Sequence, residues 1–332
     1  MAPNGTIYDP DQDFDAHPDF PHVQTKTYVP QLKEGEAALI PKQPVIAPTS
    51  RAIDADPSLP NLLKSGVVRL DLTPSIGTEL LNVQLANLND AGRDELALLV
   101  AQRGVVFFRA QEISDAQQGS LFNYFDRLED VPLEQAGARV HDIKEFGKSD
   151  SSSECLAQSY PSRNPVEADY RQTYTYYPWK FADAHADGSF QVNPPSLSLL
   201  KITDIPAGGG GDTVWTSQYG LYDSLSPALQ AFFSTLKAVH TSQDIFEAKS
   251  GFEGRTLKDP PIDTHHPLVI THPVTGWRAL YYNSNFVRRI AGTKYYESQA
   301  LEHFLTQHID SAQDQQVRFR LGQSCLSAPS YT

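Results

Sequence analysis

The sequence predicts an α+β fold, and three observations carry this prediction. Capped helical patterns alternate with short runs rich in β-branched and aromatic residues. Two of these runs are joined by a turn containing proline and glycine, which is typical of an antiparallel hairpin. The 332 residues show no internal repeat and allow one large domain or two ordinary ones. We therefore expect a mixed domain whose strands are mostly antiparallel.

Residues 1–64 are predicted to form an extended, proline-rich arm. Ten of the 24 prolines of the chain lie within residues 1–60, where apolar periodicity is weak. The pattern changes near Ser65, and we expect the folded domain to begin there.

The first elements of the domain follow from periodicity and capping residues. Alternation over residues 67–72 predicts a strand. Asn89 predicts the N-cap of a helix that ends at Gly104. The apolar residues 105–108 predict a buried strand, and a second helix is expected from Ser114. The later elements are expected as strands at 196–202 and 212–215 around a four-glycine turn, a helix at 226–238, a hairpin of 268–271 with 278–282, and a helix at 296–309.

Composition excludes several classes of protein. The chain has 27 Lys+Arg against 40 Asp+Glu and a formal net charge of −13, which argues against a nucleic-acid-binding surface. No apolar run approaches the ~20 residues of a membrane-spanning helix. Residues 1–14 do not resemble a secretory signal, and Cys155 and Cys325 are too few for a disulfide framework. We expect a cytoplasmic protein with neither nucleic acid nor membrane as a partner.

The pattern His-x-Asp occurs three times, and one occurrence suits a metal site. His308/Asp310 ends a predicted helix, where side chains two residues apart diverge. His17/Asp19 lies in the arm, without packed neighbours to orient it. The chain around His185/Asp187 is expected to be extended, so both side chains would share one face. An imidazole and a carboxylate on one face suit a 2-His-1-carboxylate Fe(II) site. An ordinary His–Asp hydrogen bond at a strand end explains the same spacing.

Six stretches of the chain follow one another in a specific order and spacing. They are Leu72-Thr73-Pro74-Ser75-Ile76-Gly77, Arg103-Gly104-Val105-Val106-Phe107-Phe108-Arg109, His185-Ala186-Asp187, Gly210-Gly211-Asp212-Thr213-Val214-Trp215-Thr216-Ser217, Thr271-His272-Pro273-Val274-Thr275-Gly276 with Tyr282-Asn283, and Val317-Arg318-Phe319-Arg320. With these stretches, residues 67–320 resemble the taurine dioxygenase family of Fe(II)- and 2-oxoglutarate-dependent enzymes, especially its fungal sulfonate-dioxygenase branch.

The resemblance implies a fold, a cofactor set and site residues. It implies a double-stranded β-helix (jelly-roll) core with flanking helices. His185 and Asp187 would ligate Fe(II), and the Thr213 hydroxyl would contact a carboxylate of 2-oxoglutarate. Phe246 and Phe286 would line the substrate pocket, although burial in the core explains these two rings equally well. The implied reaction hydroxylates a small organic substrate with O₂, with sulfonates as one candidate class, and releases succinate and CO₂.

The resemblance also has departures. The family carries its third iron ligand, a distal His, and a 2-oxoglutarate-binding Arg after the Arg-x-Arg strand, but residues 321–332 do not match that pattern. Acids at Glu129 and Asp130 replace a substrate-binding His of the taurine enzymes. We therefore expect a C-terminally incomplete dioxygenase domain at 65–320 with a non-family tail at 321–332. The chain is then a fragment of an active enzyme, an inactive homologue, or an enzyme with an unusual ligand set that draws on His266, His272, Arg318 or Arg320.

Overall fold

The computed structural model describes residues 50–126, 184–186, 188–192, 194, 196–202, 213–241 and 263–319, and the backbone of residues 325–329. The predicted site residues Asp187 and Phe246 lie outside the described residues, as do the four-glycine turn and Arg320. No described helix is both long enough and apolar enough to cross a membrane.

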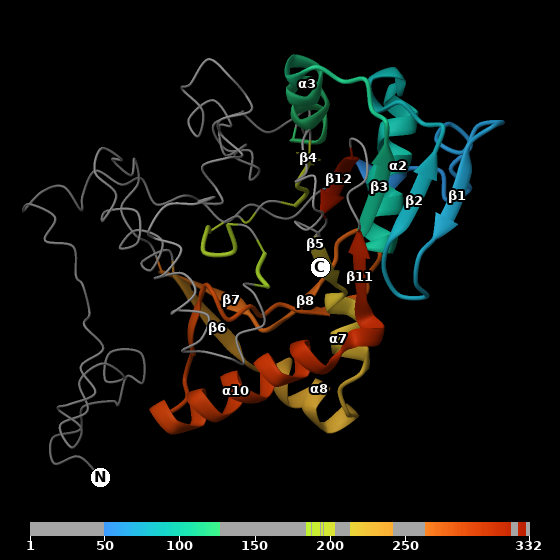
Figure 1. Cartoon of the computed structure of the whole chain (residues 1–332). Coiled ribbons are helices and arrows are strands. Elements are labelled where there is room, and N and C mark those ends of the chain that lie inside the picture. The colour runs from blue at the N-terminus through green and yellow to red at the C-terminus, as the bar shows by residue number, and fades with distance from the viewer. Residues whose placement is uncertain are drawn as a thin grey trace, which may run out of the picture.

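The larger sheet has five strands in the order β1-β2-β3-β12-β4 (Figure 1). Their bounds are Val68–Asp71, Thr78–Leu81, Val105–Arg109, Cys325–Pro329 and Leu200–Ile202. Only β2 and β3 pair in parallel, which confirms the prediction of mostly antiparallel strands. The strand expected at 196–202 is shorter than predicted, since regular pairing begins at Leu200. The backbone of β12 lies between β3 and β4, so part of the predicted tail belongs to this sheet.

Two helices pack with the larger sheet. Helix α2 spans Asp90–Arg103, with Asn89 accepting a hydrogen bond from the Gly92 amide. Gly104 ends this helix with a φ of 74°, a left-handed conformation that glycine adopts without strain. Helix α3 spans Asp115–Asp126. Both predicted helices are confirmed at these positions.

The first core extends further toward the N-terminus than predicted. Ala52, Leu59 and Leu62 are almost fully buried against α2 and β3, although they were predicted to belong to the extended arm of residues 1–64. A short 3₁₀ helix, η2 (Arg51–Asp54), begins this packed segment. The predicted domain start at residue 65 therefore falls inside the packed region.

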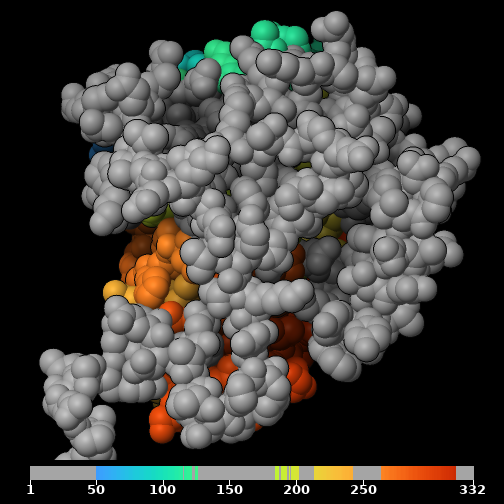
Figure 2. All heavy atoms as spheres, turned by 90° about the vertical axis from the view of Figure 1, so that its left-hand side faces the viewer, coloured from blue at the N-terminus to red at the C-terminus, as the bar shows by residue number. Residues whose placement is uncertain are grey.

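Among the described residues, the rest of the molecule contains a smaller sheet, two ribbons and the helices that follow them in sequence or precede them. The sheet has the order β10-β6-β7, and the ribbons are β8-β9 and β11-β5. The strand bounds are Val287–Ile290, Lys237–Thr241, Asp263–Pro267, Val269–Thr271, Arg278–Leu280, Gln316–Phe319 and Thr213–Thr216. The helices are α7 (Gln218–Asp223), α8 (Pro227–Phe233) and α10 (Tyr295–Ser311). They share a second core with this sheet. Figure 2 shows green α3 at the top and orange-red α10 at the bottom of the molecule.

The predicted helix at 226–238 is wrong in its second half. Helix α8 ends at Phe233, and Lys237 and Ala238 belong to β6. The hydroxyls of Ser234 and Thr235 donate to the carbonyls of Gln230 and Phe232, which closes the last turn and competes with helix continuation. The hairpin of β8 with β9 and helix α10 are confirmed.

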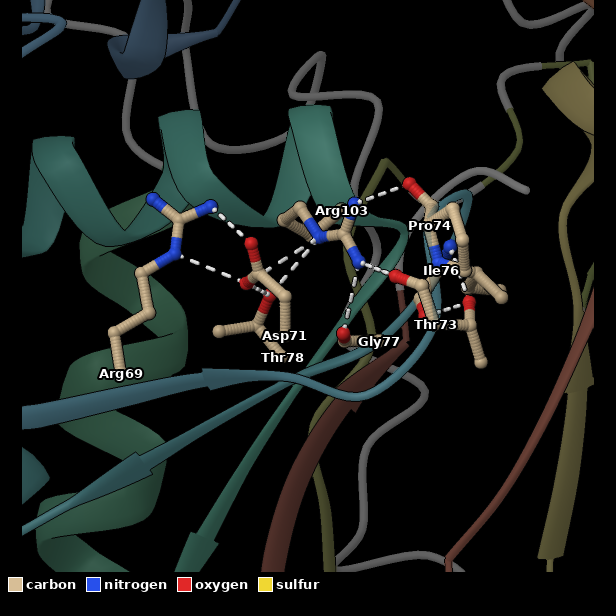
Figure 3. A network of polar contacts seen from close by, with 8 residues as sticks. All are labelled: Arg69, Asp71, Thr73, Pro74, Ile76, Gly77, Thr78 and Arg103. Atoms are coloured by element: carbon tan, nitrogen blue, oxygen red, sulfur yellow. Dashed lines mark hydrogen bonds and ion pairs between the residues drawn. The ribbon is translucent and has the colours of Figure 1, made fainter.

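The Arg103 side chain ties α2 to the turn between β1 and β2 (Figure 3). Its guanidinium donates to the carbonyls of Thr73, Pro74 and Gly77 and to the Thr78 hydroxyl, and it pairs with Asp71. The matching stretch 72–77 is therefore held by a structural network. The same turn places Ile76 in a small core with Val105, Phe107 and Val317.

We expect Arg103→Lys to destabilise the protein by about 2 kcal/mol, because an ammonium group cannot make the forked contacts with several oxygens at once. Urea unfolding measures the loss. Arg69→Lys is the matched control, since Arg69 pairs with the same Asp71 at the surface and should change stability by less than about 0.5 kcal/mol. Equal effects for the two variants would contradict this role of Arg103.

Candidate functional site

His185 lies in an irregular segment beside β7, drawn yellow-green in Figure 1. Residues 184–186 form no regular strand, and a turn follows in which the Ser189 amide donates to the Ala186 carbonyl. Gly188 has a φ of 66°, which interrupts an extended chain. The sequence predicts an extended chain around His185 and Asp187, and the turn at Gly188 begins after this pair. Asp187 lies outside the described residues, so a shared face for the two side chains stays a prediction.

The Phe286 ring and the Asn285 side-chain amide contact the exposed His185 imidazole. Its ring meets the edge of Phe286 at a centroid distance of 5.6 Å and an angle of 89°. Its Nδ1 lies 3.5 Å from the Asn285 amide nitrogen. Phe286 is only 7% exposed and also packs edge-on against Phe190. Phe286 is thus both buried and next to His185, which is compatible with packing in the core and with lining a substrate pocket.

Each residue of the segment Ser189–Gln191 is held by a side chain of another element. The Ser189 hydroxyl lies 3.0 Å from His240 Nδ1 and accepts from the Asn283 amide at 3.1 Å. The Phe190 carbonyl accepts from the Thr264 hydroxyl. The Gln191 carbonyl lies 2.8 Å from His266 Nε2. The chain that follows the His-x-Asp pattern is therefore attached to β6, β7 and the loop after β9.

Behind this segment, His240, His266 and Tyr281 form a cluster of aromatic rings. His240 stacks on Tyr281 at 5.2 Å and meets the His266 ring edge at 5.2 Å. Because the Gln191 carbonyl can only accept, His266 carries its proton on Nε2. Within the described part of the chain, His240 Nε2 and the Tyr281 hydroxyl are buried without a hydrogen-bond partner.

Burial keeps three histidines neutral, namely His240, His266 and His272. It lowers the pKa of His240 to about 3, and the neighbouring His266 ring adds to that shift. Burial also lowers the pKa of His266, while the hydrogen bond to the Gln191 carbonyl opposes the shift. Burial alone lowers the pKa of His272 to about 4.

We expect stability to fall as the pH is lowered below about 6.5. The unfolded chain takes up protons on His240 and His272 near their ordinary pKa of 6.5, whereas the folded chain does so only near 3 and 4. Between pH 6.5 and pH 5 these two histidines together cost about 3 kcal/mol. Urea unfolding at a series of pH values measures this, and His272→Asn should remove about half of the dependence. A stability that stays flat over this range would contradict neutral burial.

Thr213 begins β5 and is half-buried. It pairs with Phe319 of β11, while Val214 pairs with Arg318. Successive residues of a strand point to opposite faces, so Thr213 lies on the face of Trp215 and Val317, and the exposed Arg318 lies on the other. Arg318 and Thr213 therefore project away from one another on this ribbon.

The two histidines considered as substitute ligands have structural partners. His272 Nδ1 accepts from the Val274 amide in the β8-β9 turn, and its ring faces Tyr219. His266 donates to Gln191 within the cluster. Ser189 and His240 were not predicted from the sequence, and Asn283 was named only within a matching stretch, without a role. The available signal was the polar His240 directly after the apolar pair Ala238-Val239, but the predicted helix of 226–238 covered the first two residues of β6.

The donor chemistry at the His-x-Asp pattern fits a divalent iron. The exposed, oriented imidazole of His185 is a suitable nitrogen ligand, and a carboxylate follows two residues later. Within the part of the chain that the structure describes, no three His, Cys, Asp or Glu residues gather into a metal-binding group. His185 is therefore the described member of the predicted ligand pair, and the backbone that follows it is anchored.

Comparison with known proteins places these features in context. Residues 69–325 match the family model described as "Taurine catabolism dioxygenase TauD, TfdA family". The alpha-ketoglutarate-dependent dioxygenase cnsP of Penicillium expansum is 36% identical over 275 residues, covering 80% of this chain and 69% of that protein. The alpha-ketoglutarate-dependent sulfonate dioxygenase of Saccharomyces cerevisiae is 32% identical over 271 residues. That alignment covers 80% of this chain and 62% of the yeast protein, so this chain spans less than two thirds of its length.

A solved structure agrees with these matches. A taurine dioxygenase from Burkholderia xenovorans superposes with a TM-score of 0.55 at 26% identity, covering 80% of each chain. Such neighbours have a jelly-roll fold, and the described residues of this chain combine helices and mainly antiparallel sheets in the same way.

Proposed function

The chain belongs to the taurine catabolism dioxygenase (TauD, TfdA) family, and we propose that it hydroxylates a small organic molecule with release of succinate and CO₂. Members of this family are oxidoreductases that use Fe(II) and 2-oxoglutarate. We propose a jelly-roll core for its dioxygenase domain, as in its structural neighbours. The observation that carries the proposal is the exposed His185 imidazole, oriented by Phe286 and Asn285 within a chain that matches the family over residues 69–325.

In this proposal His185 and Asp187 hold Fe(II), and the Thr213 hydroxyl donates to a carboxylate of 2-oxoglutarate. The bound iron and 2-oxoglutarate together supply the oxidising power that places one atom of O₂ in the product and the other in succinate. Phe286, with its ring buried beside His185, excludes water on that side of the site. Phe246 would line the substrate pocket with it.

We propose sulfonates as the first substrate class to test, since the yeast relative at 32% identity is named a sulfonate dioxygenase. A sulfonate hydroxylated on the carbon next to sulfur breaks its C–S bond and yields an aldehyde and sulfite. The substrate panel therefore varies both the length of the carbon chain and the anionic head group.

The experiment incubates the purified chain with Fe(II), 2-oxoglutarate and O₂ and follows succinate by NMR. Taurine, longer alkanesulfonates and an alkyl sulfate ester form the substrate panel, with sulfite as a second product. We expect at least one compound to raise succinate formation above the substrate-free rate. Metal-dependent binding of 2-oxoglutarate without succinate would instead favour the alternative, a homologue that binds without turnover. A chain that binds neither metal nor 2-oxoglutarate would contradict the proposed activity of this chain and favour an inactive homologue or a fragment of an active enzyme.

A further inference from the structure

The buried side chains behind His185 have no role in the proposed chemistry itself, but they hold the chain on which that chemistry depends. We infer that Ser189, His240 and Asn283 form a positioning network that fixes the His-x-Asp segment for metal binding. This inference rests on the proposed function. It adds residues that touch neither metal nor substrate but determine how well the ligands are placed.

The orientation of Asn283 is fixed by its two hydrogen bonds. Its Oδ1 accepts from the Phe286 amide at 2.9 Å, so its Nδ2 must be the group that donates to the Ser189 hydroxyl. Asn283 is 2% exposed and Ser189 is fully buried, so neither bond is exchanged with water. One side chain therefore links the turn after Asp187 to the loop that carries Phe286.

His240 gives Ser189 a second fixed partner. The ring is fully buried, and its Nδ1 has the Ser189 hydroxyl as its hydrogen-bond partner, while no described residue bonds to Nε2. A ring with one polar partner loses that bond outright if the turn moves, because no water replaces it. Stacking against Tyr281 prevents the imidazole from following the turn.

The network and the contacts of His185 meet in one short loop. Asn285 and Phe286 contact the His185 ring, while Asn283 holds Ser189, so this loop is attached to the chain on both sides of position 187. Ligands that are fixed before the metal arrives bind it more tightly, because less conformational freedom is lost on binding. The geometry thus predicts that the Ser189 hydroxyl contributes to metal affinity without touching the metal.

The test compares Ser189→Ala with Tyr281→Phe in the full chain. Both variants delete one buried hydroxyl from a residue that contacts His240. Only the Ser189 hydroxyl is bonded to the network, whereas that of Tyr281 has no hydrogen-bond partner among the described residues. Calorimetric titration with Mn(II) gives the metal affinity, and hydrogen exchange of the metal-free chain reports the protection of residues 185–192. Thermal unfolding shows whether each variant is folded.

We expect Ser189→Ala to weaken Mn(II) binding by about 10- to 100-fold and to speed exchange in residues 185–192. Tyr281→Phe should leave both unchanged. If the wild type binds Mn(II) and Ser189→Ala binds it equally tightly, the inference is overturned and the proposed function still stands. Wild-type protein that binds no Mn(II) would overturn the proposed function and, with it, a role for this network in metal binding.

Discussion

His185→Ala is expected to abolish succinate formation and to weaken Mn(II) binding by on the order of 100-fold or more, while the fold is retained. His185 is the one member of the proposed ligand pair that lies among the described residues, and its side chain is exposed at the irregular segment before Gly188. Its removal deletes a metal–nitrogen bond but takes little apolar surface out of the core. Calorimetric titration with Mn(II) and NMR detection of succinate measure the two losses.

A matched control for this variant is His303→Ala on helix α10. His303 is also exposed, but it lies on the helix that packs against the second core, away from the His-x-Asp segment. It should retain the wild-type affinity for Mn(II). Equal metal affinity in the wild type and His185→Ala would remove His185 from the site, even if the chain proved active.

Glu95→Ala is expected to destabilise the protein by about 3 kcal/mol, the largest loss of stability predicted for a single polar side chain here. The Glu95 carboxylate is 2% exposed and accepts three hydrogen bonds, from the Asn61 and Leu62 amides and from the Asn61 side chain, each at 2.7 Å. Alanine leaves these buried donors without a partner and opens a cavity beneath them. The segment around Leu59 and Leu62 would lose its attachment to α2.

Urea unfolding measures this loss, with Glu112→Ala as the control. Glu112 is exposed, and the described bond at this position uses its backbone amide, which alanine keeps. The control should shift stability by less than about 0.5 kcal/mol. Hydrogen exchange should also show the amides of Asn61 and Leu62 losing protection in Glu95→Ala. Unchanged stability in that variant would contradict the proposed anchoring of the N-terminal segment.

The elements predicted correctly are those with strong local signals. Helix α2 has a capping Asn89 and a terminal Gly104, and the β8-β9 hairpin has a Pro/Gly turn. The strands β6 and β7 were missed because their signals are not local. Strand β7 contains two histidines and a proline with no apolar alternation, and it is a strand because β6 supplies its hydrogen bonds. Strand β6 follows α8 too closely for periodicity to separate them.

In the candidate site, too, the residues in short motifs were predicted, whereas the contacts between residues far apart in the sequence were not. His185, Asp187 and Thr213 were assigned through the resemblance, which depends on the order of short motifs. The contacts of Ser189 with His240 and Asn283 join residues 51 and 94 positions apart. No pattern within one segment indicates such contacts, because they depend on how the sheet and the loop after β9 pack together. The sequence therefore indicated the ligands but not the residues that hold them.

The most direct test of the central claim is a titration of 2-oxoglutarate into the Mn(II)-loaded chain under anaerobic conditions, with the metal-free chain as reference. The proposed site requires the co-substrate to chelate the metal held by His185 and Asp187, so we expect binding only when Mn(II) is present, and its loss in His185→Ala. Binding of 2-oxoglutarate that is equally tight without metal, or absent with it, would contradict a metal- and 2-oxoglutarate-dependent site in this chain.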